Sequence, residues 1–348
     1  MSELRRWRKA IFIVAACVLL IIGLAVWRWR VSHFDWGRFF STLTEINWTW
    51  LILAIVLMLL TYVGRALRWE VMLRPLRPHP SLWNLCSATV IGFTAVVILG
   101  RPGELVRPYL IAIKERVPFS SQMAVWLLER VLDTIAVLLI FGFALTRMPA
   151  HSLHVSTLQW LLKAGGYIVA LICAACVLFL FIFRNFSETA QRRVLSAVTF
   201  LPDQHYKRVE SSLAAFVQGM QSTRDHSFLA LLLGYTVLEW VVIVAGYYFV
   251  FRAFAATAGF ALADVLMFVG FVALGSIIQI PGIGGGVQVA SVIVLTELFG
   301  LTLESATGMA LLIWVLSFLS VVPFGLAFAF HEGINWRKFR HLAAEVPG

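Results

Sequence analysis

Charged residues are scarce in this chain of 348 residues. Lys, Arg, Asp and Glu together make up 13% of the sequence, whereas soluble domains average about 25% charged residues. Hydrophobic residues make up 60%, and mean hydropathy is +0.87. So few charges could not cover soluble domains of this size, and an aromatic content of 14% excludes a disordered chain. The composition predicts a polytopic integral membrane protein.

Cysteine is scarce as well, and the motifs of several enzyme classes are missing. Four cysteines exclude a disulfide scaffold, and the C-x-x-C pair Cys173 and Cys176 lies in an apolar segment without further metal ligands. The sequence contains no Walker motif, no H-E-x-x-H and no G-x-S-x-G, and its histidines are scattered in loops and tails. We therefore expect no enzyme activity, no ATP hydrolysis, no cofactor and no metal site.

The net charge of +10 is explained by membrane topology. A nucleic-acid partner is not expected, because the basic residues stand in short runs between apolar segments rather than on one soluble face. Such runs are typical of cytoplasmic loops under the positive-inside rule. The first run, over 5–9, precedes the apolar segment 10–27, which ends in Trp and Arg rather than in a cleavage site. We expect an uncleaved first helix with its N-terminus in the cytoplasm.

Apolar segments follow one another along the chain, and two of them are too short to cross a bilayer, since a span needs about 20 residues. Each short segment follows a longer one across a break rich in Gly and Pro. Non-helical backbone at membrane depth is tolerated only where protein or water satisfies it. The pattern predicts two re-entrant hairpins, 81–113 and 262–300. The segments are 10–27, 48–64, 81–100, 105–113, 123–145, 160–183, 228–251, 262–280, 287–300 and 305–330.

The distribution of basic residues supports re-entry of the first hairpin. If that hairpin crossed the membrane, the basic loop 184–226 would face outward, against the positive-inside rule. The predicted fold is an all-α polytopic membrane helix bundle, a single transmembrane domain over 1–348 with about six full spans. The hairpin 81–113 opens on the cytoplasmic side and the hairpin 262–300 on the external side, a layout compatible with an inverted repeat.

The predicted cellular location is the plasma (inner) membrane, with multiple spans and both termini in the cytoplasm. The residues 331–348 form a cytoplasmic tail in this topology. Within the loop 184–226, apolar residues recur at helical spacing after Pro202. This pattern predicts an amphipathic helix that either lies on the cytoplasmic membrane surface or packs over loops.

The first cluster of candidate binding residues lies at the break of the first hairpin. Arg101, Glu104 and Arg107 are spaced by three, so a helix that starts at the break would place them on one face. Pro102 suits the first turn of such a helix, whose N-terminus offers free N–H groups to an anion. Two guanidinium groups beside it favour a phosphate site. The alternative is a cytoplasmic loop whose charges pair in water.

The second cluster lies inside the segment 123–145. Glu129 and Asp133 share a helix face, and Arg130 lies within reach of Asp133 at a spacing of three. Ionisable groups within a span are costly and usually face a partner or a wet cavity. The three residues are candidates for substrate binding, and a structural salt bridge to the first hairpin is the alternative.

Arg65 and Arg68 stand beside Trp69 at the end of the segment 48–64. Arginine and tryptophan at a membrane boundary serve either as an interface anchor or as contacts to lipid headgroups, and the sequence leaves both readings open. We include both arginines among the candidate substrate-binding residues.

The break of the second hairpin is a glycine-rich turn. Glycines let backbone N–H groups approach a phosphate or a neighbouring helix, although the Gly-Lys-Ser/Thr of a P-loop does not follow. In the segment 228–251, Glu239 is a candidate proton carrier, and a hydrogen-bonded structural acid is the alternative. The candidate residues of the turn are Pro281, Gly282, Gly284, Gly285 and Gln288.

These motifs occur in an order that resembles one known family. The matching pieces are Arg65-x-x-Arg68-Trp69, Arg101-Pro102-Gly103-Glu104-x-x-Arg107, Glu129-Arg130-x-x-Asp133 and Pro281-Gly282. Over about residues 8–333 the sequence resembles the lysylphosphatidylglycerol synthase transmembrane region, also called the flippase-like domain family. The resemblance implies a membrane protein that moves a lipid between leaflets.

Two departures from the family pattern matter. Typical members place a glutamate shortly after the glycine turn, whereas this sequence has the neutral Gln288, which argues against a proton or cation role of the second hairpin. Long members append a soluble aminoacyl-transferase domain, whereas this sequence ends eighteen residues after Phe330. We therefore do not expect lysyl transfer to phosphatidylglycerol.

The predicted function is a flippase-like transporter that moves an anionic or aminoacylated phospholipid, or a lipid-linked molecule, between leaflets. Two alternatives stay open: a proton-coupled transporter of small solutes that uses Glu104, Glu129 and Glu239, and a non-transporting membrane partner of a lipid-modifying enzyme. The expected partners are membrane lipids, with a lipid-modifying enzyme or a homo-oligomer as further options.

Overall fold

The computed structural model describes residues 34–146, 171–176, 178, 195–196, 203–219, 226–276, 279–280 and 284–333. Over these residues the regular secondary structure is helical except for one antiparallel pair of two-residue strands, so the predicted all-α class is confirmed. The predicted helix over 10–27, most of the segment 160–183, the tail beyond 333, and Pro281 and Gly282 lie outside the described residues.

The elements follow the predicted apolar segments closely. They are α2 (Trp36–Thr44), α3 (Trp48–Leu73), α4 (Leu82–Leu99), η1 (Arg101–Leu105), α5 (Val106–Glu115), α6 (Phe119–Thr146), α9 (Asp203–Gly219), α10 (His226–Ala253), α11 (Leu262–Gly275), β1 (Gln279–Ile280), β2 (Gly284–Gly285), α12 (Gly286–Ile293), η4 (Val294–Leu298), α13 (Leu303–Ser317), η5 (Leu319–Val321) and α14 (Val322–His331). Among the described residues, four helical stretches are long and apolar enough to cross a membrane: Trp48–Leu73, Leu82–Leu99, Ser227–Ala253 and Leu303–His331, the last of which includes the short turn η5.

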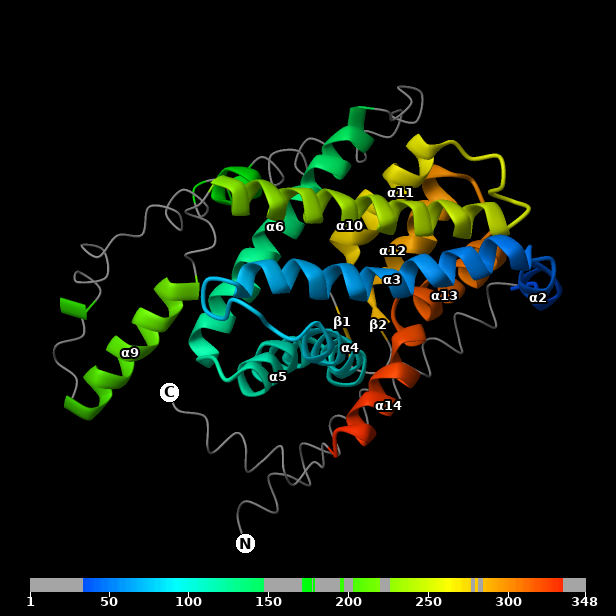
Figure 1. The fold of residues 1–348 in the computed structure, drawn as a ribbon. Helices are drawn as coiled ribbons and strands as arrows, with labels where there is room; N and C mark the ends of the chain where they lie inside the picture. Colours follow the sequence, from blue (N-terminus) through cyan, green and yellow to red (C-terminus); the bar gives the residue numbers. More distant parts are fainter. Residues whose placement is uncertain are drawn as a thin grey trace, which may run out of the picture.

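Helices α3 and α10 form the centre of the molecule. They pack along each other over much of their length, and α6 runs obliquely to both (Figure 1). Helix α3 begins at Asn47, whose side chain accepts hydrogen bonds from the backbone N–H groups of Thr49 and Trp50. It does not end near residue 64, as the apolar pattern predicted, but continues to Leu73. Arg65 and Arg68 therefore lie within the helix rather than at its end.

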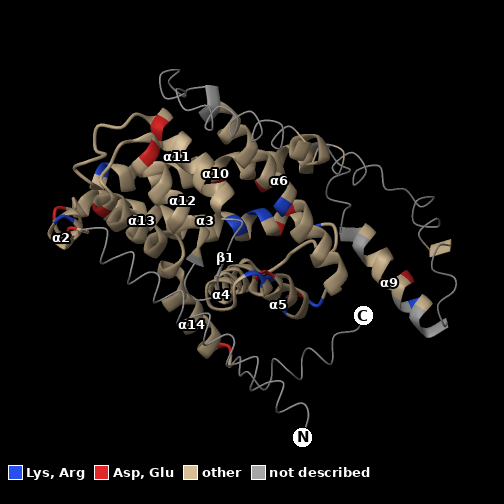
Figure 2. Ribbon diagram, turned by 180° about the vertical axis from the view of Figure 1, so that it is seen from behind, with Lys and Arg blue, Asp and Glu red and all other residues tan. Residues whose placement is uncertain are grey.

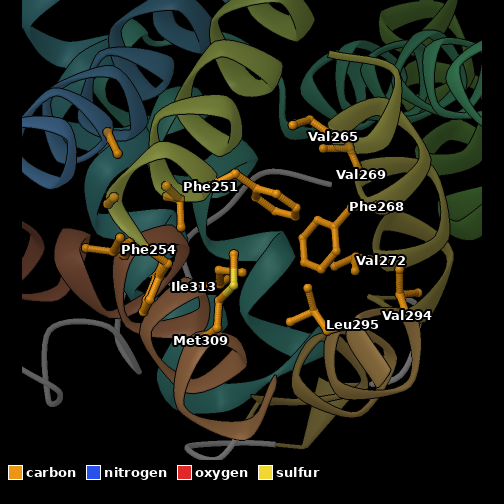
Figure 3. Packing of buried hydrophobic residues seen from close by; sticks show 14 of the residues in the cluster. Phe251, Phe254, Val265, Phe268, Val269, Val272, Val294, Leu295, Met309 and Ile313 are labelled. Atoms are coloured by element: carbon orange, nitrogen blue, oxygen red, sulfur yellow. The ribbon is translucent and has the colours of Figure 1, made fainter. Parts of the chain in front are cut away.

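The larger hydrophobic core joins α3 and α10 to α11, α12 and α13. Figure 3 shows Phe251 of α10 facing Phe268 of α11, with Met309 and Ile313 of α13 and Phe254, the residue after α10, in the same cluster. The rings of Phe251 and Phe268 meet edge to face at 5.0 Å, a favourable arrangement of aromatic quadrupoles. This core fixes the second half of the chain against the central helix pair.

The first predicted break is the end of a helix. Helix α4 ends at Leu99, and Gly100 has a φ of 71°, which a residue with a Cβ rarely adopts. The 3₁₀ turn η1 then leads into α5, which packs back against α4. Gly103 touches α4 so closely that a Cβ there would collide with the main chain of Ala95. Glycine at 100 and 103 therefore permits this tight reversal.

The second predicted break also separates two helices. Helix α11 ends at Gly275, the strands β1 and β2 pair across the glycine-rich turn, and α12 begins after Gly285, whose φ is 94°. Helices α11 and α12 pack against each other, and a Cβ on Gly275 would collide with Ala290 of α12. The chain thus reverses at both of the predicted breaks.

A third break was not predicted. The segment 305–330 reads as one apolar run, but α13 ends at Ser317 and α14 begins at Val322 after the 3₁₀ turn η5. Pro323 stands in the first turn of α14, where its missing N–H costs nothing. Inside a continuous helix the same proline would remove a hydrogen bond and clash with the preceding turn, which explains the interruption.

The helix predicted after Pro202 is present as α9, from Asp203 to Gly219. It packs against the helix α6, and its position on the cytoplasmic membrane surface or over loops stays a prediction. In Figure 1 it lies beside the N-terminal end of α6.

Candidate functional site

Seven charged residues from four helices meet in the interior. Four guanidinium groups face three carboxylates, so the cluster has a formal charge of +1. Figure 2 shows this concentration of charge where α3 and α6 pass each other, in an otherwise apolar fold. We call the cluster the ionic network; it comprises Arg65 and Arg68 of α3, Arg107 of α5, Glu129, Arg130 and Asp133 of α6, and Glu239 of α10.

Glu129 is the centre of the ionic network. Its carboxylate accepts hydrogen bonds from Arg68 at 2.8 Å and from Arg107 at 3.0 Å. Arg130 and Arg65 lie at 3.4 and 3.7 Å from the same oxygen. The side chain is fully buried, so several guanidinium groups are needed to offset the cost of removing its charge from water.

Arg68 connects the three carboxylates. Besides Glu129, it donates to Asp133 at 2.7 Å and lies 3.3 Å from Glu239. Its side chain is completely buried. A role as an interface anchor or as a direct headgroup contact does not fit this position, and Arg68 acts as the brace that holds α3, α6 and α10 together.

Asp133 and Glu239 complete the pairing. Arg130 lies 3.2 Å from Asp133 on the same helix, which confirms the spacing argument made from the sequence. Arg65 lies 2.9 Å from Glu239 on α10. Glu239 therefore ties Arg65 of α3 to α10, whereas the pair of Arg130 and Asp133 lies within α6.

Arg107 joins the first hairpin to the network. Its guanidinium lies 4.1 Å above the ring of Trp69 and donates to the carbonyl oxygen of Arg65 at 3.0 Å. Gly92 makes this position accessible, because a Cβ there would come within 2.6 Å of the Arg107 Cβ. The ion pair with Glu129 is the salt bridge to the first hairpin that the sequence offered as an alternative.

Trp69 is not an interface anchor, because it is completely buried. Its indole N–H donates to the side-chain oxygen of Gln122 at 3.0 Å, and its ring supports the Arg107 guanidinium. A local pattern of arginine and tryptophan cannot distinguish these two roles, since both place the ring near the end of an apolar run.

A cavity of about 360 Å³ opens beside the ionic network, and we call it the charged cavity. Four residues of the network line this cavity: Arg65, Arg107, Arg130 and Asp133. The other three, Arg68, Glu129 and Glu239, form ion pairs with the network and do not line the cavity. The first break contributes two further charged residues, Arg101 and Glu104, to the wall. The apolar part of the wall includes Gly92, Phe93, Val96, Trp126, Val137, Leu138, Trp240, Leu274 and Phe318.

The two breaks meet at the edge of the charged cavity. Arg101 and Glu104 of η1 pair at 2.6 Å, and Arg101 also donates to the carbonyl oxygen of Ser276 at 3.3 Å. Ser276 follows α11, where helical carbonyl groups lack intrahelical partners and attract a cation. Arg101, Glu104 and Arg107 thus all line one cavity, as their spacing suggested.

The second turn contributes less than predicted. Gln288 of α12 and Gly284 and Gly285 do not line the charged cavity, although Ser276 before the turn does. Among the described residues, no group of three or more His, Cys, Asp or Glu side chains has the arrangement of a metal site. The chemistry of this region is therefore that of arginines facing an amphipathic cavity.

The family model described as the lysylphosphatidylglycerol synthase TM region matches residues 10–325. The chain belongs to this family. The resemblance proposed from the sequence motifs is therefore confirmed, and three of those motifs supply the ionic network and the wall of the charged cavity. Membership in this family places the chain in a membrane.

A UPF0104 membrane protein of Methanothermobacter thermautotrophicus is 21% identical over 286 residues, which cover 78% of this chain and 82% of that relative. No solved structure matches the chain. The relative's description agrees with the membrane assignment.

Several residues around the site were missed by the sequence argument. Phe93, Trp126 and Trp240 give the charged cavity its aromatic wall, and Gly92 seats Arg107. Aromatic residues are frequent throughout this sequence, so no local signal marks these three. Gly92 is an isolated glycine in an apolar helix. Such a glycine occurs at close contacts between helices but also for other reasons, so the sequence does not identify its role.

Proposed function

We propose that this protein moves an anionic lipid, or a lipid-linked anion, between the leaflets of the plasma membrane. In this proposal the protein is not an enzyme, and the charged cavity receives the headgroup while the acyl chains stay in lipid. The observation that carries the proposal is the charged cavity itself, where arginines of both the ionic network and the first break line one amphipathic chamber.

The exposed charge in this cavity favours an anion. Arg101 and Arg130 have side chains that are 48% and 34% exposed, whereas Glu104 and Asp133 are only 15% and 13% exposed. The ionic network also has one more guanidinium than carboxylates. A phosphate oxygen would complete the pairing, because guanidinium groups bind phosphate through parallel hydrogen bonds.

The meeting of the two breaks supports alternating access. We propose that the two reversals lie within the bilayer and enter from opposite faces, with both termini in the cytoplasm. Interrupted helices that meet at a binding site are typical of transporters, where one half of the fold moves against the other. The hydrogen bond between Arg101 and the Ser276 carbonyl would then lie on the boundary between the moving parts.

A transport assay in lipid vesicles tests the proposal. The protein is reconstituted, and the movement of fluorescent phospholipids between leaflets is followed by chemical quenching of the outer leaflet. We expect Arg101→Gln with Arg130→Gln to slow transport of anionic lipids at least tenfold. The matched control is Arg74→Gln, which removes an arginine that pairs with Glu70 on the surface of α3. Equal rates for the double variant and the control would contradict the assignment.

One observation favours proton coupling as a second candidate function. Glu239 is buried, and its partner Arg65 lines the charged cavity, so a proton taken up by Glu239 would release an arginine at the site. Uptake of protons that requires a soluble solute and is lost in Glu239→Gln would support this candidate. Co-purification with one soluble lipid-modifying enzyme, without any transport, would point instead to a membrane partner.

A further inference from the structure

A second, smaller cavity adjoins the charged cavity. It has a volume of about 190 Å³ and lies between α3, α10, α11 and α13. The two cavities share a wall, so we treat the second as a side chamber of the first and call it the hydroxyl pocket. The shared residues are Arg65, Phe93, Trp240, Ala273, Ser276 and Phe318.

Hydroxyl groups are the main polar feature of this pocket. Tyr62 donates to the carbonyl oxygen of Ser317 at 3.2 Å, and the hydroxyls of Tyr247 and Ser317 share one hydrogen bond at 3.4 Å. Tyr247 and Ser317 each carry one hydroxyl hydrogen, and their shared hydrogen bond uses only one of the two. The other hydrogen is therefore available to donate to a ligand in the pocket. The buried indole N–H of Trp240 has no hydrogen-bond partner among the described residues. The pocket therefore offers both donors and acceptors to a neutral polar group.

Arg65 is the one charged residue among the described residues that line the hydroxyl pocket. Its guanidinium lies 4.9 Å from the centre of the Phe93 ring and so covers an aromatic face that would otherwise attract a cation. None of the described residues that line the pocket carries a carboxylate to receive an ammonium group. An amine placed here would face a guanidinium and lose its hydration, which is unfavourable.

The arrangement places an anion site next to a neutral polar pocket, with Arg65 on the wall of both. We propose that the hydroxyl pocket binds the neutral, hydroxyl-bearing part of a phosphodiester lipid headgroup, such as a glycerol, an inositol or a sugar. The phosphate of that headgroup lies at Arg65 in the charged cavity. This inference rests on the proposed function and narrows its substrate class, because amine-bearing and aminoacylated headgroups do not fit the pocket.

Transport rates for three lipids test the pocket in the vesicle assay. Phosphatidylglycerol has a single negative charge and two headgroup hydroxyls, and phosphatidylethanol has the same charge without hydroxyls. Phosphatidylethanolamine replaces the hydroxyls by an ammonium. We expect the wild-type protein to move phosphatidylglycerol about fivefold faster than phosphatidylethanol, as one or two hydrogen bonds provide, and phosphatidylethanolamine more slowly than either.

The variants separate the pocket from the charged cavity. Tyr247→Phe combined with Ser317→Ala should make the rates for phosphatidylglycerol and phosphatidylethanol equal, because the rate for phosphatidylglycerol falls more than the rate for phosphatidylethanol. Trp240→Phe should lower the preference partly. Tyr235→Phe is the matched control, since Tyr235 lies on the same helix α10 but lines neither cavity.

The outcomes distinguish the two proposals. If the pocket variants keep the full preference while Arg101→Gln with Arg130→Gln stops both anionic lipids, the hydroxyl pocket is wrong and the proposed function stands. Equal wild-type rates for phosphatidylethanolamine and phosphatidylglycerol would also overturn the pocket. If no lipid moves at all, the proposed function fails. Native mass spectrometry of the protein with the same lipids then tests binding in the hydroxyl pocket. Preferential retention of phosphatidylglycerol supports the pocket, and equal retention of the three lipids overturns it.

Discussion

The guanidinium of Arg101 donates a hydrogen bond of 3.3 Å to the carbonyl oxygen of Ser276, across 175 positions of sequence. The contact joins the 3₁₀ turn at the first break to the end of α11 before the second. Each break alone is only an interruption of an apolar helix. Together they form one rim of the charged cavity.

The first prediction concerns this rim. Cysteines replace Arg101 and Ser276 in a background without the native cysteines, and a short bifunctional maleimide joins them. The rates to compare are those of the double-cysteine variant before and after cross-linking, because this variant already lacks Arg101. We expect cross-linking to reduce its remaining lipid transport at least tenfold, because the two breaks can no longer move apart. Each single cysteine variant treated with the same reagent serves as a control. An unchanged rate after cross-linking would show that this boundary does not move.

The second prediction concerns Glu129 as the centre of the ionic network. Glu129→Gln leaves several buried guanidinium groups without their shared partner, and breaking buried pairs of this kind costs about 3–5 kcal/mol. We expect a clear decrease in the thermal unfolding midpoint in detergent, followed by tryptophan fluorescence. Glu70→Gln is the control, because Glu70 pairs with the half-exposed Arg74, and such surface pairs contribute about 1 kcal/mol or less. Equal midpoints for the two variants would contradict the central role.

The third prediction tests the close contact between Gly92 and Arg107 without changing any charge. Gly92→Ala places a methyl group within 2.6 Å of the Arg107 Cβ, so α5 must move away from α4. Overpacking of this kind costs about 1–3 kcal/mol, and transport should fall because Arg107 leaves its position. Gly234→Ala in α10 is the control, since a Cβ there meets no atom within 4 Å. That change should be neutral or slightly stabilising, because alanine favours helices over glycine.

The fourth prediction concerns a pair remote from the cavity. Lys114 of α5 lies 2.5 Å from Glu332, which follows α14, and both side chains are largely buried. Glu332→Lys should destabilise the protein by bringing two like charges together. Adding Lys114→Glu restores the opposite charges and should recover about 0.5–3 kcal/mol of interaction energy in a double-mutant cycle. A double variant no more stable than Glu332→Lys would show that the pair does not join these elements.

Local spacing predicted the contacts that lie within one helix or one turn. Arg130 and Asp133, and Arg101 and Glu104, pair as residues three apart should. The breaks at Gly100 and before Gly285 were also predictable, because glycine and proline interrupt helices through local sterics.

Contacts between distant elements were not predictable from one sequence. Arg68 reads as a boundary residue because polar residues follow it, yet the carboxylates that allow its burial come from α6 and α10. Trp69 was misjudged for the same reason, since Gln122 and Arg107 reach it only in the folded chain. A buried charge is stable only beside its partners, and a linear pattern does not contain their positions.

Under the proposed function, the excess of one guanidinium in the ionic network would link lipid supply to protein abundance. A ligand that binds only the folded state stabilises it by about 2.7 kcal/mol at one hundred times its dissociation constant. An anionic lipid at the charged cavity is then a structural counter-ion as well as cargo. A cell depleted of such lipids would contain less folded protein, because quality control removes chains of lower stability. The amount of this protein would therefore report on the lipid composition of its membrane.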